Sequence, residues 1–349
     1  MKKRKIGIDA RMWGHPGIGR YLRELSGAMA AEPFEHELFY IRGRAKIYGL
    51  AEQWEIPWKA RHFDLLHVPH FNIPVLFNGK LVVTIHDLTY FHSPEVSKSP
   101  LAKLYVTWLL RTIRKKARAI LAVSEYTKKD LLETFPGIPE NLVFVTHEAA
   151  APEFRKIEDE NALARIRGKY SLNRPFVLFV GSLKKHKNVP ALIEAVARLK
   201  ERKNIPHELV LTGKSGPTEK ELTALIGRHD FVRMIGEAEG RDLPGLYSLA
   251  EAFVLPSFRE GFGLPVLEAM ACGTPVVVSN RTSLPEVAGD AGLLFDPERI
   301  DALEDVLYNV LNNNELRKNM IQRGFEQAQR FSWKRTAEQT LQVYRQALS

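Results

Sequence analysis

Short apolar runs alternate with amphipathic stretches along the first half of the chain. Near-continuous apolar runs of this length are typical of strands that are buried on both faces of a parallel sheet. Between several runs, apolar residues recur at helical spacing. The pattern predicts strands at residues 5–8, 37–41, 65–68, 81–85, 119–123 and 142–146, and helices at 18–31, 100–117 and 127–135.

The second half repeats this alternation. It predicts strands at 176–180, 209–212, 232–235, 252–255, 275–279 and 293–295, and helices at 189–203, 219–228, 244–250 and 265–271. The charged stretch 152–175 has no strand pattern, so we place a domain boundary there. We expect an α/β protein with two Rossmann-like, doubly wound domains, residues 1–155 and 172–332, facing across a cleft. Ligands of such sheets bind at the carboxyl ends of the strands.

Composition fits an ordinary globular protein of two domains. The 349 residues are 45% hydrophobic and 26% charged, and no apolar run is long enough to span a membrane. The basic start meets Asp9 too early for a signal peptide, and the single Cys272 permits no intrachain disulfide, so we expect a cytoplasmic protein. Residues 1–152 hold 22 basic and 15 acidic residues, most of the net charge of +9, which favours an anionic partner for this half.

Several common phosphate and metal motifs are incomplete. Gly17 and Gly19 follow the first strand and open a helix, but a dinucleotide fingerprint needs a third glycine where Leu22 stands. A P-loop would need glycine in place of Glu208. The sequence contains no Asp-any-Asp pair and no metal-ligand spacing of histidines, so we expect no metal cofactor.

The stretch 255–275 carries the most chemical information. A strand ends near Pro256, a glycine-containing loop follows, and Pro265 suits the first turn of the next helix. Free amides at such a helix start favour a diphosphate. Glu260 in the loop and Glu268 in the helix could accept hydrogen bonds from two sugar rings. Taken alone, the pair would as readily be a solvated loop residue and a carboxylate that complements the helix dipole.

These residues resemble the signature of the retaining glycosyltransferases of family GT4. The two glutamates are separated by seven residues and enclose Gly261-Phe262-Gly263. The resemblance extends over nearly the whole chain and includes 17–21, His86-Asp87, 123–125, 179–181 and 331–333. It implies a GT-B fold, a nucleotide-sugar donor as a substrate, and a last helix, 333–349, that packs back onto the first domain. Nucleic acid is not an expected partner.

The resemblance implies a role for each matching residue. Glu260 would hold the transferred sugar and Glu268 the ribose, while the amides of Gly261, Phe262, Gly263 and Leu264 would contact sugar and phosphates. His86, Glu260 and Lys187 are the candidate catalytic residues. Further donor-binding candidates are Gly17, Gly19, Gly181, Ser182, Gly236 and Glu237, and acceptor-binding candidates are Arg20, His70, Asp87 and Ser124.

The diphosphate motif departs from the common family pattern. Ser182 stands where many relatives have arginine, and His186 stands where a Ser or Thr subgroup has one. Lys184, Lys185 and His186 are the alternatives for a second cation beside Lys187. That subgroup resembles bacterial mannosyl- and rhamnosyltransferases of surface-polysaccharide synthesis, so we expect mannose from GDP-mannose and a glycan or lipid-linked acceptor. A UDP-sugar donor, an epimerase or hydrolase, and a non-catalytic nucleotide-sugar-binding protein are the alternatives.

The segment 98–118 carries seven basic residues and no acidic one. Its helical pattern places an apolar face opposite these charges, and amphipathic basic helices bind anionic membrane surfaces. We therefore expect peripheral contact with the inner face of the membrane through this segment.

Overall fold

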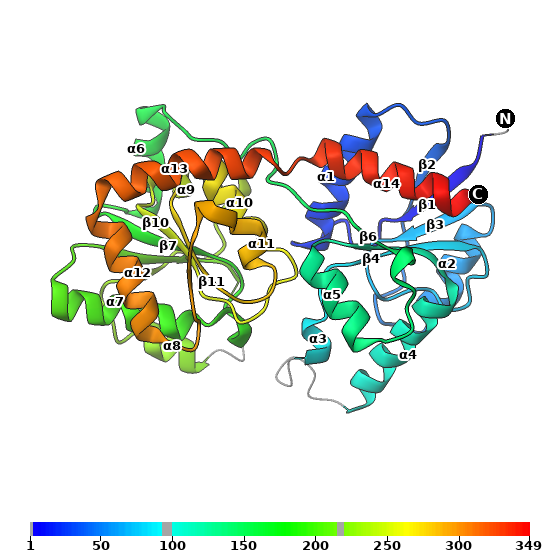
Figure 1. Ribbon diagram of the computed structural model, residues 1–349, viewed down its shortest axis with the longest axis horizontal. Helices are drawn as coiled ribbons and strands as arrows, with labels where there is room; N and C mark the ends of the chain where they lie inside the picture. Colours follow the sequence, from blue (N-terminus) through cyan, green and yellow to red (C-terminus); the bar gives the residue numbers. More distant parts are fainter. Residues whose placement is uncertain (1–2, 93–99, 215–219) are drawn as a thin grey trace. The chain divides into compact units, whose positions relative to one another are not determined.

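The computed structural model describes residues 3–92, 100–214 and 220–349. The chain forms two compact units (Figure 1). Unit 1 comprises Met1–Glu148 with Ser332–Ser349, and unit 2 comprises Ala149–Phe331. Each unit is an all-parallel sheet with helices on both faces, so the predicted α/β class and doubly wound design are confirmed.

The sheet of unit 1 has the strand order β2-β1-β3-β4-β5-β6. Its central strands are almost completely buried, which explains their near-continuous apolar sequences. The strands are β1 Lys5–Asp9, β2 Glu37–Ile41, β3 Leu65–Val68, β4 Lys80–Ile85, β5 Ala117–Ala122 and β6 Val143–Val145.

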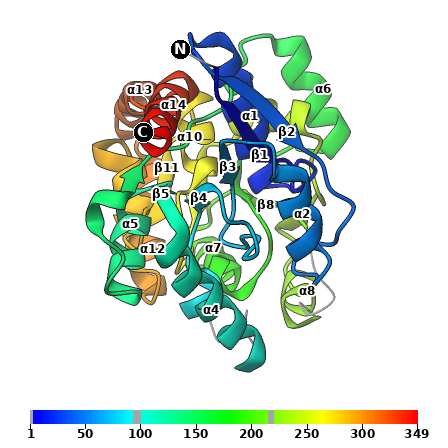
Figure 2. The ribbon, with the colours of Figure 1, turned by 90° about the vertical axis from the view of Figure 1, so that its right-hand side faces the viewer.

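Two pairs of helices cover this sheet on opposite faces. On one face, α1 Ile18–Ala31 packs against α14 Trp333–Leu348, which also contacts β3, β4 and β5. On the other face, α2 Glu52–Ala60 and α4 Pro100–Lys116 bury residues such as Ile56 and Leu110 in one apolar cluster with Leu66 and Val83. In Figure 2, α14 is drawn at the upper left and α4 at the bottom. The short α3 Thr89–His92 and α5 Glu125–Thr134 complete unit 1.

Unit 2 has the strand order β12-β11-β10-β7-β8-β9. The strands are β7 Phe176–Val180, β8 Glu208–Thr212, β9 Val232–Met234, β10 Ala252–Leu255, β11 Val276–Ser279 and β12 Leu293–Phe295. The helices are α6 Glu160–Tyr170, α7 Val189–Lys203, α8 Lys220–Ile226, α9 Leu243–Leu249, α10 Leu264–Ala271, α11 Leu284–Ala288, α12 Ile300–Asn312 and α13 Asn314–Gln329.

The structure differs from the sequence pattern in the stretch between the sheets. Residues 149–171 belong to unit 2 and include α6, which packs against α9. Asp159 caps α6 by accepting a hydrogen bond from the amide of Asn161, and Leu163 is buried. The helices α2, α3, α11, α12 and α13 were also not predicted. Among the described helices, none is both long and apolar enough to cross a bilayer.

Candidate active site

A tight turn leads from β10 into α10 in unit 2. Gly263 precedes the helix with a φ of 107°, a left-handed conformation that glycine adopts without strain. A Cβ atom at this position would also lie 2.8 Å from Leu284. Pro265 occupies the first turn, where its missing amide hydrogen costs no helical hydrogen bond. Gly263 and Pro265 thus determine how the loop 256–263 enters the first turn of α10.

Glu260 lies in this loop at the centre of a dense polar cluster. Its carboxylate accepts hydrogen bonds from Lys187 Nζ, at 2.6 and 2.8 Å, and from Ser257 Oγ at 2.6 Å. Its main chain is held as well, because its amide donates to Thr282 Oγ1 and Ser283 Oγ donates to its carbonyl oxygen. The candidate residues Glu260 and Lys187 are therefore in direct contact, although they lie 73 positions apart along the chain.

Glu268 is 1% exposed, on the second turn of α10. Tyr247 Oη donates a hydrogen bond of 2.9 Å to its Oε2 atom. Burial, with a smaller contribution from the Glu268 charge, raises the pKa of the Cys272 thiol, which keeps this cysteine protonated. Glu268 is thus a buried carboxylate that a tyrosine hydroxyl holds in place.

Three glycines line the carboxyl ends of β7, β8 and β9. Gly181, Gly213 and Gly236 all have positive φ values, and the Gly213 amide donates to the Gly236 carbonyl at 2.8 Å. A Cβ atom on Gly213 would lie 1.8 Å from the Gly181 carbonyl oxygen, so only glycine allows these loops to approach. Glu237 is exposed and pairs with Lys214 at 3.3 Å.

The loop after β7 carries the basic residues of the predicted diphosphate site. Lys184 and Lys185 are exposed, whereas Ser182, His186 and Lys187 are half-buried. The Phe258 amide donates to the His186 carbonyl at 2.8 Å, which joins this loop to the loop of Glu260. Lys187 is therefore the basic residue of this loop that the fold brings into contact with Glu260.

His86 follows β4 in unit 1 and contacts Pro69, Glu148 and Tyr21. Its Nε2 atom lies 3.1 Å from the Pro69 carbonyl oxygen, and its Nδ1 atom lies 3.1 Å from Glu148 Oε1. Tyr21 packs edge-on against the ring at 4.8 Å between centroids. A carbonyl oxygen can only accept, so Nε2 carries the hydrogen that faces Pro69.

The other candidates of unit 1 divide into two groups. Ser124 caps α5 by accepting from the Thr127 amide, and Asp87 accepts from the Thr89 amide, so both side chains shape loops beside His86. Gly17 is exposed at the start of α1 and Arg20 is half-buried. A Cβ atom on Gly19 would lie 2.3 Å from the Trp13 carbonyl oxygen, which explains glycine there.

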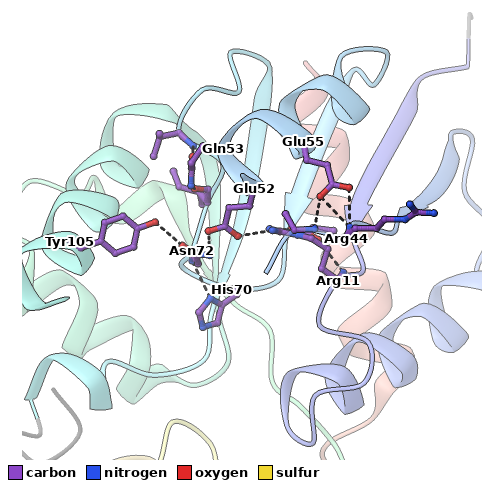
Figure 3. Close-up of polar contacts among 12 residues, drawn as sticks. Arg11, Arg44, Glu52, Gln53, Glu55, His70, Asn72 and Tyr105 are labelled. Carbon is purple, nitrogen blue, oxygen red and sulfur yellow. Dashed lines mark hydrogen bonds and ion pairs between the residues drawn. The ribbon is translucent and has the colours of Figure 1, made fainter. Parts of the chain in front are cut away.

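His70 lies after β3 in a separate polar network (Figure 3). Its Nδ1 atom accepts a hydrogen bond of 3.1 Å from the Asn72 amide, and its Nε2 atom lies 3.2 Å from Tyr48 Oη. Desolvation lowers the pKa of His70 to about 3, so the ring is neutral near pH 7. The described residues contain no group of three or more His, Cys, Asp or Glu that could hold a metal ion.

The sequence analysis did not anticipate the residues that hold the glutamates. Ser257, Thr282 and Ser283 bind Glu260, and Tyr247 binds Glu268. Thr282 has a left-handed φ of 56°, which no local sequence signal indicates. Only the proximity of Ser257 to Glu260 in the chain could have suggested a contact.

The chain matches two models of one glycosyltransferase family. The family model "Glycosyl transferases group 1" matches residues 164–327, and "Glycosyltransferase Family 4" matches residues 35–150. O-antigen chain mannosyltransferase B of Escherichia coli is 34% identical over 85% of this chain and 79% of its own length. The serotype-specific mannosyltransferase WbdA of the same species is 30% identical over 80% of this chain, which spans about a third of that longer protein.

Solved structures share the architecture. Sucrose-phosphate synthase from Thermosynechococcus elongatus superposes with a TM-score of 0.79 at 22% identity over 99% of both chains. The Anabaena protein HepE, in complex with UDP and glucose, superposes with a TM-score of 0.79 at 19% identity over 98% of this chain and 99% of its own. At these identities the likeness concerns the fold.

Proposed function

The chain belongs to the group 1 glycosyltransferases of family 4, as its motifs predicted, and from this membership we propose that it transfers mannose from GDP-mannose to a surface-polysaccharide glycan with retention of anomeric configuration. The mannose assignment is supported by the relatives named mannosyltransferases. A UDP-sugar donor is the alternative, since HepE was solved with UDP and glucose.

The observation that carries the proposal is the Lys187–Glu260 pair. The two side chains neutralise each other at 2.6 Å, next to the loop and helix start that the family uses for its donor. We assign Lys187 and the amides of residues 261–264 to the diphosphate, Glu260 to the transferred sugar and Glu268 to the ribose. Gly17, Gly19, Gly181, Ser182, Gly236 and Glu237 complete the proposed donor-binding set.

In the proposed reaction the acceptor hydroxyl oxygen forms a bond to the anomeric carbon on the face from which the nucleotide leaves. The bond between that carbon and the β-phosphate oxygen breaks, and the acceptor proton passes to the departing phosphate. The protein contributes positioning and stabilisation of the phosphate charge. We assign His86 to the transferred sugar, and Arg20, His70, Asp87 and Ser124 to the acceptor side, the last two through the loops they shape.

Transfer assays test the proposal. Purified protein is given GDP-mannose, UDP-glucose or UDP-galactose with oligomannoside acceptors, and the product's anomeric configuration is read by NMR. We expect an α-linked mannoside from GDP-mannose, with activity unchanged by EDTA. Free mannose as the sole product would instead indicate a hydrolase. Activity that EDTA abolishes and manganese restores would contradict the metal-independent mechanism.

Contact with an anionic membrane is the second proposal, and α4 supports it. Val106, Leu109, Leu110 and Ile113 are buried against the sheet. On the outer face, Leu104 and Trp108 are 64% and 46% exposed and share one helical stripe with the exposed Arg111 and Lys115. Exposed tryptophan beside basic residues is typical of helices that lie at a membrane interface.

Two tryptophans of α2 extend this surface, whereas Lys116, one of the seven basic residues of segment 98–118, does not contribute to it. Trp54 and Trp58 are exposed on α2, which covers the same face of the sheet. Lys116, in contrast, donates to the carbonyl oxygens of Val75 and Phe77 and serves the fold. Lys98 lies outside the described residues.

Co-sedimentation with vesicles tests the membrane contact. Binding should rise with anionic lipid, fall with salt, and decrease when Arg111, Arg114, Lys115 and Arg118 are replaced by Gln, since each basic residue contributes about 1 kcal/mol at an anionic surface. Replacing four exposed basic residues of unit 2, Lys203, Lys318, Arg323 and Arg330, is the matched control. Equal losses of vesicle binding in both variants would show that net charge, and not the surface of α4, causes the binding.

A further inference from the structure

Tyr48 has a backbone conformation that aromatic residues rarely adopt. Its φ is 64°, and among the five non-glycine residues with positive φ in the described part of the chain it is the one aromatic residue. Left-handed backbone is unfavourable for a bulky L-residue and persists where surrounding contacts or function require it. Glycine would satisfy the turn at Tyr48 without this cost.

The strained turn places the Tyr48 ring beside two others. The ring centroid lies 5.8 Å from that of His70 and 6.2 Å from that of Phe71, and the His70 and Phe71 centroids are 4.1 Å apart. Tyr48 nevertheless remains 52% exposed, so the contact does not bury it in the core. We call Tyr48, His70 and Phe71 the aromatic platform.

A buried polar network holds His70, one member of the platform (Figure 3). Asn72 donates from its amide to His70 Nδ1 and from its side chain to Glu52 at 2.8 Å. Glu52 in turn accepts from Arg11 at 2.6 Å, and Arg11 also binds Asp9. The side chains of Arg11 and Glu52 are only 3% and 1% exposed. Such a satisfied network fixes the position of every member.

The network also fixes the proton on His70. Because Nδ1 accepts a hydrogen bond, the neutral ring carries its hydrogen on Nε2 and donates it to Tyr48 Oη. Tyr48 then has its own hydroxyl hydrogen available for another acceptor. The platform therefore combines three aromatic rings, tilted against one another, with one directed hydroxyl donor.

The platform lies where a ligand of unit 1 is expected. Tyr48, His70 and Arg11 follow β2, β3 and β1, at the carboxyl edge of the sheet. A small pocket beside it is lined by Asp9, Arg11, Met12, Ile47, Val68, Pro69, His70 and Asn72. Asp87 and Tyr90, which follow β4, are close enough to act electrostatically on Tyr48.

We propose that the aromatic platform binds one pyranose ring of the acceptor glycan. The apolar C–H face of a pyranose matches a flat ring, and its hydroxyl oxygens can accept from Tyr48 Oη, as in ligand sites that combine aromatic walls with a few placed polar groups. The strain at Tyr48 is then the cost of presenting this ring. The identity of the ligand rests on the proposed transfer to a glycan.

The test is Tyr48→Gly, which relieves the backbone and removes the ring. We expect an unfolding temperature equal to or above that of the wild type, an acceptor KM raised about tenfold, and unchanged kcat and GDP affinity. Tyr48→Phe retains the ring and should show a smaller rise. Asn204→Gly is the matched control, because Asn204 has a similar left-handed backbone in unit 2 and should leave acceptor KM unchanged.

Saturation-transfer NMR with mannotriose and other hexose oligosaccharides measures binding without turnover. Loss of the wild-type NMR signal in Tyr48→Gly supports the platform. It does so even if the protein transfers no sugar, a result that would count against the proposed function alone. An unchanged acceptor KM and NMR signal in Tyr48→Gly would overturn the platform while leaving the proposed function standing. So would the absence of any oligosaccharide signal with the wild type.

Discussion

At the residue scale, the Lys187–Glu260 pair suggests how donor binding begins. Both side chains are largely buried, with 15% and 12% exposure, and each neutralises the other. Breaking such a pair by removing one partner leaves a poorly solvated charge. A diphosphate near Lys187 would offer the lysine a second anion and leave Glu260 available to sugar hydroxyls.

Replacing the two glutamates separates their proposed roles. Glu260→Gln should lower kcat strongly yet retain or tighten GDP binding, because Lys187 is no longer neutralised. Glu268→Gln should weaken GDP binding, since its proposed partner is the ribose. Calorimetry with GDP and transfer assays on both variants measure this. The same loss of GDP affinity in both would contradict the division of roles.

Lys187→Ala should weaken GDP binding by about tenfold or more, because a hydrogen bond to a charged group contributes roughly 1.5–3 kcal/mol. Lys184→Ala is a suitable control, as that side chain is exposed and is one alternative for the missing cation. A larger loss in Lys184→Ala than in Lys187→Ala would transfer the diphosphate contact to residue 184.

The sequence could nominate candidate residues of the site but not the contacts that hold them. The resemblance to the family nominated Glu260, Glu268 and Lys187. The partners Thr282 and Tyr247 come from other loops and helices, so only the fold brings them near. Glycine at 213 has a steric cause, the Gly181 carbonyl, that local sequence does not reveal.

At the element scale, periodicity predicted the sheets because buried parallel strands leave a strong apolar signal. It missed α2, where Pro57 stands inside the helix and two tryptophans face outward. It also missed α6, whose charged sequence buries little beyond Leu163. Tertiary packing rather than intrinsic propensity stabilises such helices.

The attachment of α14 predicts a pH dependence of stability. His67 on β3 is fully buried, with Nδ1 2.6 Å from Tyr344 Oη of α14 and Nε2 2.8 Å from Thr84 Oγ1. Burial lowers its pKa to about 3. The unfolded chain, with a histidine pKa of about 6.5, then binds more protons below that pH, so stability is complete above it and falls as the pH drops toward 3.

The expected slope is about 1.4 kcal/mol per pH unit for each such histidine, and His70 contributes in the same direction. His67→Gln should therefore be less stable at pH 7 yet lose stability less steeply between pH 6.5 and 5. Urea unfolding at several pH values gives the slope. A slope identical to that of the wild type would show that His67 is protonated in the folded state.

At the scale of the whole molecule, each unit has its own sheet and core. A ligand that binds one unit should therefore slow hydrogen exchange mainly in that unit. The proposed ribose and diphosphate contacts of bare GDP, Glu268 and Lys187, lie in unit 2. At a hundredfold excess over its Kd, GDP should stabilise the fold by about 2.7 kcal/mol. Hydrogen exchange should slow in the loops 181–188 and 256–263 more than in β3–β5 of unit 1.

GDP should raise the unfolding temperature more than UDP or ADP at equal concentration, if mannose comes from GDP-mannose. Glu268→Gln should abolish most of this rise and Glu260→Gln should preserve it, which ties the whole-molecule response to the proposed ribose contact. A larger rise with UDP would assign the donor to the UDP-sugars. Protection confined to unit 1 would contradict the proposed donor site itself, because Glu268 and Lys187, the proposed ribose and diphosphate contacts, lie in unit 2.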